Sequence, residues 1–322
     1  MMKNIITTIL AVSVICLTVY IFSGSNNSEK ATIAAPVVAA FTVSPEIPDE
    51  IEFCGDKIDL SRYNVHEGMD RELTSFTYFH SSTMLLLKRA NRYFPVIEPI
   101  LKRNGIPDDF KYLAVIESNL DPNVTSPARA VGIWQFMEST AKQYGLRITP
   151  TVDERRNISQ STEAACLYLK EAYRKYGDWV AVACSYNAGM GRISGQLEKQ
   201  NENSVLNLYL VEETLRYPYR IFAIKQIFEN PYKYGYVLKA ENLYRPIDCE
   251  EIRVNEDIPD LVAYAQKYGV TYLDLKLLNP WLRDIKLETR GNTYIILIPD
   301  KNKLFYDKSS NNYVHDRRWV VN

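Results

Sequence analysis

The chain has 322 residues, which is enough for about two domains. Hydrophobic residues make up 46% of it and charged residues 24%, a composition that excludes disorder over most of the length. The 38 Lys and Arg residues balance 39 Asp and Glu residues, so the net charge of -1 offers no single-sign field for a polyanion, and nucleic acid is not expected as a partner.

Histidine is too sparse to support two common kinds of catalytic site. The three histidines, His66, His80 and His315, lie far apart in the sequence. A His-rich metal site or a Ser-His-Asp triad needs a His close to other ligands or to a nucleophile. We therefore expect no metal and no organic cofactor, and any hydrolytic chemistry would rest on carboxylates.

The N-terminus has the features of an export segment. Lys3 is followed by an uncharged, mainly apolar stretch from Asn4 to Phe22 and then by small polar residues. The stretch is almost long enough to cross a bilayer, so residues 1–23 are either a cleaved signal peptide or a retained membrane anchor. Cys16 lacks the small preceding residue expected beside a lipidated cysteine, which favours an ordinary apolar position. We expect an exported protein of the periplasm or cell envelope.

Residues 24–50, rich in Ser, Asn, Ala, Val and Pro, are predicted to form a flexible tether, with the folded part starting near Ile51. The cysteines beyond this point are even in number and would allow a disulfide in an oxidising compartment. Two of them lie within apolar helical stretches, where a small buried hydrophobic role is favoured. The four are Cys54, Cys166, Cys184 and Cys249.

The signals between residues 66 and 235 are mostly helical. Gly105-Ile106-Pro107-Asp108-Asp109 predicts a helix start, and apolar residues continue at helical spacing to Glu117-Ser118-Asn119, so Glu117 is expected at a helix end beside a loop. Pro95 and Pro99 are expected to divide the preceding helical stretch in two. Further helices are predicted over 162–176, 179–187, which is apolar throughout and expected to be buried, and 207–229.

A different pattern begins near residue 250. Two short helical segments meet at Gly269 and are followed by the apolar strand 294–299. This order predicts a separate small α+β module over residues 250–300. Residues 301–322 form a polar tail to which the sequence assigns no role.

The most specific motif begins at Glu117-Ser118 and continues with Ser126, Gly132-x-x-Gln135-x-Met137 and Thr140-Ala141; downstream stands Ser185-Tyr186-Asn187-Ala188-Gly189. Together these segments resemble the goose-lysozyme-like (SLT, glycoside hydrolase family 23) lytic transglycosylases. The Gly-x-Trp-Gln-Phe-Met form and Glu213-Thr214-Leu215-Arg216-Tyr217 are similar to the membrane-bound D branch. Pro218 departs from that pattern, and a kink or a helix end is expected there.

The resemblance implies a mainly α fold, with a lysozyme-like catalytic domain over residues 51–240. It also implies cleavage of the β-1,4 bond between N-acetylmuramic acid and N-acetylglucosamine in peptidoglycan. In that chemistry Glu117 first donates a proton to the leaving sugar. It then takes one from the C6 hydroxyl of N-acetylmuramic acid, which attacks its own C1 and leaves a 1,6-anhydro end.

The residues agree with this chemistry. Breaking a glycosidic bond needs an acid that stays protonated near neutral pH. Glu117 becomes one if neighbours such as Trp134, Phe136, Met137 and Tyr186 disfavour its charged form.

No convincing second carboxylate stands nearby in the sequence. Asp121, before Pro122, is expected to cap a turn, and Glu138 to be a first-turn acid of the next helix. Attack from within the same sugar needs no captured water, because its nucleophile is already at high effective concentration.

The remaining motif positions receive roles through the resemblance. Ser126, Gln135 and Asn187 would hydrogen-bond the acetamido group of the sugar or hold Glu117. Tyr186 would reach the Glu and the reacting centre, and Met137 would pack against the muramyl ring. The alternatives are a core position for Met137 and a helix-plugging role for Tyr186.

Residues 250–299 resemble a degenerate LysM module, a βααβ unit that binds N-acetylglucosamine chains. Its opening Gly-Asp-Thr-Leu turn is replaced by Glu256-Asp257-Ile258-Pro259, so a structural appendage is an equal alternative. For the whole chain, the alternatives are a hydrolytic muramidase that uses water and a catalytically silent peptidoglycan-binding protein. The sequence leaves open exo or endo action, stem-peptide preference and oligomeric state.

Overall fold

A computed structural model describes residues 42–306 and 312–321 of the chain. The predicted signal or anchor (residues 1–23) and most of the predicted tether lie outside the described residues. In the part that is described, no helix combines the length and the apolar character that a bilayer crossing requires.

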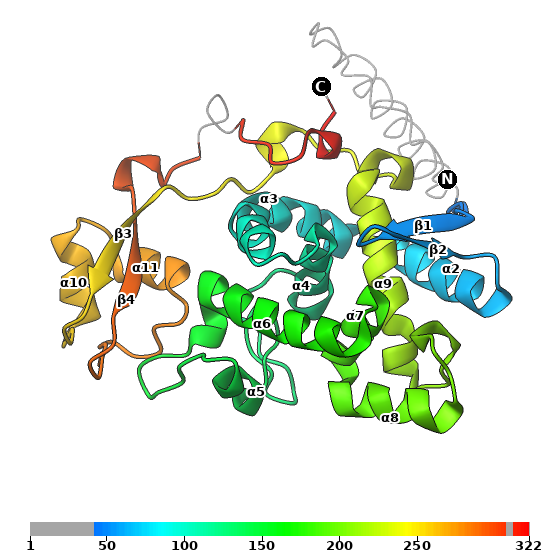
Figure 1. The fold of residues 1–322 in the computed structure, drawn as a ribbon. Coiled ribbons are helices and arrows are strands. Elements are labelled where there is room, and N and C mark those ends of the chain that lie inside the picture. The colour runs from blue at the N-terminus through cyan, green and yellow to red at the C-terminus, as the bar shows by residue number, and fades with distance from the viewer. Residues whose placement is uncertain (1–41, 307–311, 322) are drawn as a thin grey trace, which may run out of the picture. The chain divides into compact units, whose positions relative to one another are not determined.

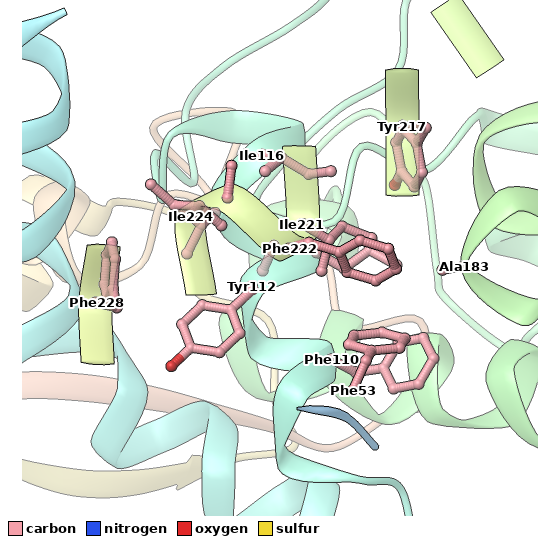
Figure 2. Close-up of a cluster of buried hydrophobic side chains, with 14 of the residues drawn as sticks. Phe53, Phe110, Tyr112, Ile116, Ala183, Tyr217, Ile221, Phe222, Ile224 and Phe228 are labelled. Atoms are coloured by element: carbon pink, nitrogen blue, oxygen red, sulfur yellow. The ribbon is translucent and has the colours of Figure 1, made fainter. Parts of the chain in front are cut away.

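The described chain opens with an antiparallel hairpin. Strand β1 (Glu50–Phe53) pairs with β2 (Asp56–Asp59). The inward side chain of Phe53 is buried, and its ring lies 5.9 Å from that of Phe110 and 5.2 Å from that of Phe222 (Figure 2). The hairpin is thereby attached to the aromatic core of the helical domain.

The fold of the larger domain is mainly α, as predicted. Its helices are joined by connections of different length, with long ones before and after α5, and Figure 1 shows the helices gathered around α4. They are α2 (Tyr63–Tyr78), α3 (His80–Arg103), α4 (Lys111–Ser118), α5 (Glu138–Gln143), α6 (Ile158–Tyr176), α7 (Trp179–Ala188), α8 (Met190–Gln200) and α9 (Glu212–Glu229).

Helix α4 is short and almost entirely buried, and it packs against α3 and α9. A one-turn 3-10 helix, Asp108–Phe110, precedes it and supplies the acidic first turn that the sequence indicates. An eight-residue helix is marginal by itself, so the packing of its neighbours holds it in place.

The structure corrects the predicted division at Pro95 and Pro99, and at Pro218 it excludes a helix end, one of the two predicted alternatives. Helix α3 runs without interruption through Pro95 and Pro99, and α9 runs through Pro218, so no helix ends at these residues. A proline inside a helix costs about 3 kcal/mol. Both helices bury several large apolar side chains against the core, and this burial outweighs the local cost.

The C-terminal module has the predicted βααβ order. Strand β3 (Cys249–Val254) pairs antiparallel with β4 (Tyr294–Pro299), and helices α10 (Leu261–Lys267) and α11 (Tyr272–Leu278) lie between them in the chain. The module has a hydrophobic cluster of its own, in which Leu261, Leu275 and Ile296 have no exposed surface. This cluster is separate from the hydrophobic cluster of the helical domain.

The four cysteines of the described chain are free, so the disulfide that their even number would allow is absent there. Cys166 and Cys184 are buried in the helical core, where each serves as a small apolar side chain.

The tail that follows the module packs onto the helical domain. The Trp319 side chain is only 3% exposed, and its Nε1 donates a hydrogen bond of 2.9 Å to the Phe228 carbonyl oxygen. The indole ring also lies 5.9 Å from the ring of Phe94. Upstream of it, the His315 backbone N–H donates to Oδ1 of the fully buried Asn91. Trp319 therefore anchors a tail whose composition is otherwise mainly polar.

Replacing that anchor should destabilise the protein. Trp319→Ala removes a buried aromatic side chain, and we expect the free energy of unfolding to fall by about 3–5 kcal/mol. Phe305→Ala is the matched control, since Phe305 belongs to the same C-terminal stretch but is 81% exposed. Urea unfolding of the two variants measures the difference, and equal midpoints would contradict the anchoring role.

Candidate active site

Glu117 lies in the last turn of α4, at the helix end where the sequence predicts it. The next two residues outside this helix, Asn119 and Leu120, have left-handed backbone angles, with φ of 54° and 55°. Asn tolerates this conformation, whereas for Leu it costs about 1–2 kcal/mol. Full burial of the Leu120 side chain offsets that cost. The sharp reversal of the chain ends the helix at Ser118, one residue after Glu117.

Glu117 is partly buried, and its carboxyl group is hydrogen-bonded to Tyr217. Tyr217 is a buried residue of α9, and its hydroxyl donates to Glu117 Oε1. Burial raises the pKa of Glu117 above its ordinary value. The Tyr217 hydrogen bond and the charge of Arg220 oppose this rise, and the charge of Glu213 adds to it.

Aromatic residues line the region beside Glu117. Tyr186 of α7 donates from its hydroxyl to the Trp134 carbonyl oxygen over 2.7 Å, and its ring lies 6.1 Å from that of Phe136. Burial, and then the charge of Glu117, raise the pKa of Tyr186 far above its ordinary value. Tyr186 therefore stays protonated, and its hydroxyl fixes the backbone at Trp134 through this hydrogen bond.

Residues 124–137, which we call the substrate loop because they carry the predicted substrate contacts Ser126, Gln135 and Met137, form most of the connection from α4 to α5. Short backbone bridges join Thr125 to Val131 and Val131 to Phe136. Because these bridges fold the loop back on itself, the three predicted residues belong to one compact segment.

The polar residues of the substrate loop retain hydrogen-bonding capacity. Ser126 Oγ accepts from the Ala130 N–H at 3.0 Å, which leaves its own hydroxyl hydrogen available. Gln135 Nε2 donates to the Gly132 carbonyl oxygen at 2.8 Å, and its Oε1 accepts no hydrogen bond from the described residues. Met137 is 44% exposed, so the alternative that it belongs to the core does not hold. The loop therefore offers a donor, an acceptor and an apolar thioether.

Asn187 contacts α9, not Glu117. Its Oδ1 accepts from Thr214 Oγ1 at 3.0 Å, and its Nδ2 donates to Glu213 Oε1 at 3.3 Å. Asn187 thus orients the carboxylate of Glu213, whose charge acts on Glu117.

A cavity of about 600 Å³ lies between α2, α3 and α9 and includes Asn119, Glu213 and Arg220 in its wall. Phe79 contributes an exposed aromatic ring to it. Arg216, also in the wall, is fixed by the buried carboxylate of Glu72, with 2.6 Å between Nε and Oε1. The cavity is therefore close to the groups that tune Glu117 and is lined by charges of both signs.

The two carboxylates that the sequence analysis weighed as partners of Glu117, Asp121 and Glu138, have the roles expected of them. Asp121 Oδ1 accepts from the Asn123 N–H at 2.9 Å and caps a turn. Glu138 lies in the first turn of α5 and pairs with Lys142 at 2.6 Å on the surface. No group of three or more His, Cys, Asp or Glu residues suited to a metal ion occurs in the described ranges.

Sequence reasoning missed three site residues, all on α9. Glu213, Tyr217 and Arg220 follow one another at spacings that place them on one face of a helix. The motif around Glu213 and Tyr217 was visible in the sequence, but only the packing of α9 against α4 brings it to Glu117.

The raised pKa of Glu117 predicts a pH-dependent cost to stability. Because the folded state binds this proton more tightly than the unfolded state, stability falls as the pH rises from 4.5 through the folded pKa. Glu117→Gln removes the titration. The variant should therefore match the parent below pH 4.5 and become progressively more stable than it at higher pH. Urea unfolding at several pH values measures this difference.

Glu138→Gln is the matched control, because its ion pair with Lys142 lowers the pKa of Glu138. At high pH, Glu138→Gln should therefore be less stable than the parent. A Glu117→Gln advantage that stays constant or shrinks as the pH rises would contradict the assignment of a raised pKa.

Comparison with known proteins identifies both domains. Residues 94–208 match the family described as Transglycosylase SLT domain, and residues 250–302 match the Soluble lytic transglycosylase C-terminal LysM-like domain. Membrane-bound lytic murein transglycosylase D of Escherichia coli K12 is 28% identical over 259 residues, which are 78% of this chain and 55% of that protein. The chain thus spans about half the length of this relative.

Two further kinds of similarity are shorter or weaker. Peptidoglycan transglycosylase gp16 of Escherichia phage T7 is 33% identical over 109 residues, 33% of this chain and 8% of that protein. Among solved structures, the chain is similar to the 70 kDa soluble lytic transglycosylase SLT70 of Escherichia coli, with 18% identity, a TM-score of 0.39, and coverage of 55% of this chain and 34% of that one. The chain therefore carries a transglycosylase SLT domain, followed by a LysM-like domain of the kind found at the C-terminus of soluble lytic transglycosylases.

Proposed function

We propose that the protein is a peptidoglycan lytic transglycosylase. It cleaves the β-1,4 bond between N-acetylmuramic acid and N-acetylglucosamine and leaves a 1,6-anhydro-N-acetylmuramic acid end. The SLT domain and the names of the relatives support the substrate and the reaction class. The observation that carries the proposal is the Glu117 carboxyl, which has a raised pKa and stands at a helix end near a charged cavity.

Glu117 acts twice in this reaction. As the bond from C1 to the leaving oxygen breaks, the protonated carboxyl gives its proton to that oxygen. The resulting carboxylate then takes the proton of the C6 hydroxyl, and the C6 oxygen forms the new bond to C1. No water is consumed, and Glu117 ends the cycle protonated again.

Opposing effects on Glu117 suit these two roles. Burial and Glu213 favour the protonated form that begins the reaction, whereas Tyr217 and Arg220 favour the carboxylate that forms in its course. An acid that must also serve as a base works best with a pKa close to the operating pH. Because Tyr217 occupies Oε1, the proton transfers fall to Oε2.

The substrate loop supplies the contacts to the sugar. Ser126 donates its free hydroxyl hydrogen and Gln135 Oε1 accepts from the acetamido N–H, while the exposed side chain of Met137 packs against the muramyl ring. Tyr186 holds the loop through the Trp134 carbonyl oxygen, and Asn187 holds Glu213. These five residues therefore bind substrate or position the groups that do.

A hydrolytic muramidase is the closest alternative. It would need a second carboxylate to activate water, and Asp121 and Glu138 are engaged elsewhere. Glu213 is the carboxylate that favours this alternative, because its charge acts on Glu117. The masses of the products separate the two reactions.

The substrate also implies a location. Peptidoglycan lies outside the cytoplasmic membrane, so the enzyme works in the cell envelope and residues 1–23 direct its export as a signal or anchor. The relatives include membrane-bound lytic murein transglycosylases, which supports an envelope location.

Digestion of purified sacculi tests the proposal. We expect fragments whose muramic acid ends are one water lighter than reducing ends, as mass spectrometry of the released material would measure. Glu117→Gln keeps the shape of the side chain but removes the acid, and it should lower release by about 10²–10⁴-fold. Reducing ends would establish the muramidase instead. Equal release by parent and variant would leave only a glycan-binding protein.

Tyr217→Phe tests the tuning of Glu117. Loss of the hydrogen bond that favours the carboxylate should raise the pKa of Glu117, so the basic limb of the pH profile of kcat/KM should move to higher pH. A hydrogen bond to a charged group contributes about 1.5–3 kcal/mol, so kcat should fall by at least about tenfold. Tyr219→Phe on the same helix is the control, and a basic limb that stays in place in both variants would refute this role for Tyr217.

A further inference from the structure

The LysM-like module is joined to the catalytic domain by more than its linker. A hairpin at residues 147–156, which we call the connecting hairpin, lies between α5 and α6 and reaches the module. Its residue Val152 has no exposed surface and belongs to the hydrophobic cluster of the module, not to that of its own domain. The core of the module is therefore completed by a residue from the catalytic domain.

Backbone hydrogen bonds fix this junction. Val152 forms an antiparallel bridge with Leu282, the Asp153 N–H donates to the Trp281 carbonyl oxygen at 2.8 Å, and the Arg283 N–H donates to the Thr151 carbonyl oxygen at 2.9 Å. Trp281 and Leu282 are themselves buried. A junction with paired backbone and shared core has one defined geometry, unlike a flexible appendage.

The base of the hairpin is tied to the module as well. The Arg147 guanidinium lies 4.5 Å above the centre of the Tyr294 ring, and Arg147 also pairs with the buried carboxylate of Glu154 at 2.8 Å. Glu154 accepts the Arg147 backbone N–H too, at 2.7 Å. The module thus contacts both the tip and the base of the connecting hairpin.

Arg155, in the second half of the connecting hairpin, holds the substrate loop. The buried Arg155 pairs with Asp153 through both carboxylate oxygens, at 2.9 Å and 2.8 Å, and its Nη1 donates to the carbonyl oxygens of Phe136 and Arg129. Gly132 approaches so closely that a Cβ there would lie 1.9 Å from the Arg155 carbonyl oxygen. The backbone that carries Gln135 and Met137 therefore rests on Arg155.

The substrate loop needs this support because its own conformation is strained. Arg129 and Gln135 have positive φ values of 66° and 50°, a conformation that costs about 1–2 kcal/mol for each such residue. The fully buried Ile133 and Trp134 anchor the middle of the loop, but the exposed Met137 has no such anchor. Contacts from outside must hold the flanking residues.

We propose that the module positions the substrate loop, through the connecting hairpin and Arg155. The proposal rests on the proposed function, since it assigns the module a part in placing Gln135 and Met137 for the glycan. It makes Val152 and Arg155 positioning residues that act through the loop. It also gives the module a role that does not depend on glycan binding by the module itself.

Hydrogen exchange of the full chain tests the connection without any substrate. Val152→Ser and, separately, Leu282→Ala should loosen the junction and speed amide exchange across residues 131–137 by about tenfold, whereas exchange in α4 and α9 should stay as in the parent. Leu273→Ala is the matched control, because Leu273 lies in the same module and is 64% exposed. Faster exchange in the module with an unchanged substrate loop would overturn the proposal.

Arg155→Lys tests the middle of the path, because Lys keeps the charge but loses the planar fork. In Arg155→Lys, the rate of amide exchange across residues 131–137 should rise as it does in Val152→Ser. The rate in the module should stay as in the parent. On glycan strands, both variants should lower kcat/KM but leave its pH profile in place, since Glu117 and Tyr217 are untouched. Unaltered kcat/KM together with an unaltered loop would overturn the proposal, whereas a loosened loop in a chain without lytic activity would overturn only the proposed function.

Discussion

The hydrogen bond between Tyr217 and Glu117 is the contact on which the candidate site depends, because it joins α9 to the end of α4. Burial of Glu117 favours the neutral form of its carboxyl group. The hydrogen bond from the Tyr217 hydroxyl partly offsets this effect, because it favours the charged form. The packing of α4 between α3 and α9 keeps this pair in register.

Strain near the site is balanced by burial and by partners elsewhere. The left-handed Leu120 directs the chain away from Glu117 at a cost that its buried side chain offsets. Gln135 has a similar backbone, and the loop around it rests on Arg155 and on the hydroxyl of Tyr186. The substrate loop, residues 124–137, is thus held from two sides by groups outside it.

The C-terminal quarter of the chain, which holds the module and the tail, is more closely integrated with the catalytic domain than its composition indicates. Val152 completes the core of the module, and Trp319 enters the core of the helical domain after the chain has left the module. Contacts in two regions of the sequence, around Val152 and around Trp319, therefore connect the C-terminal part to the catalytic domain. A truncation at the module boundary would remove both.

Local signals in the sequence were enough to determine that a helix follows Gly105 and closes around Glu117, and that two short helices and a strand follow residue 250, because caps, breakers and periodicity act over a few residues. The full βααβ order was implied by the resemblance to LysM modules. The motif residues that define the family could also be identified there. Only the tertiary structure decided that helices continue through Pro99 and Pro218, that Tyr217 meets a carboxyl 100 residues earlier, and that Trp319 is buried. Burial and electrostatic contact depend on distance in space, and residues far apart in sequence carry no local pattern that fixes it.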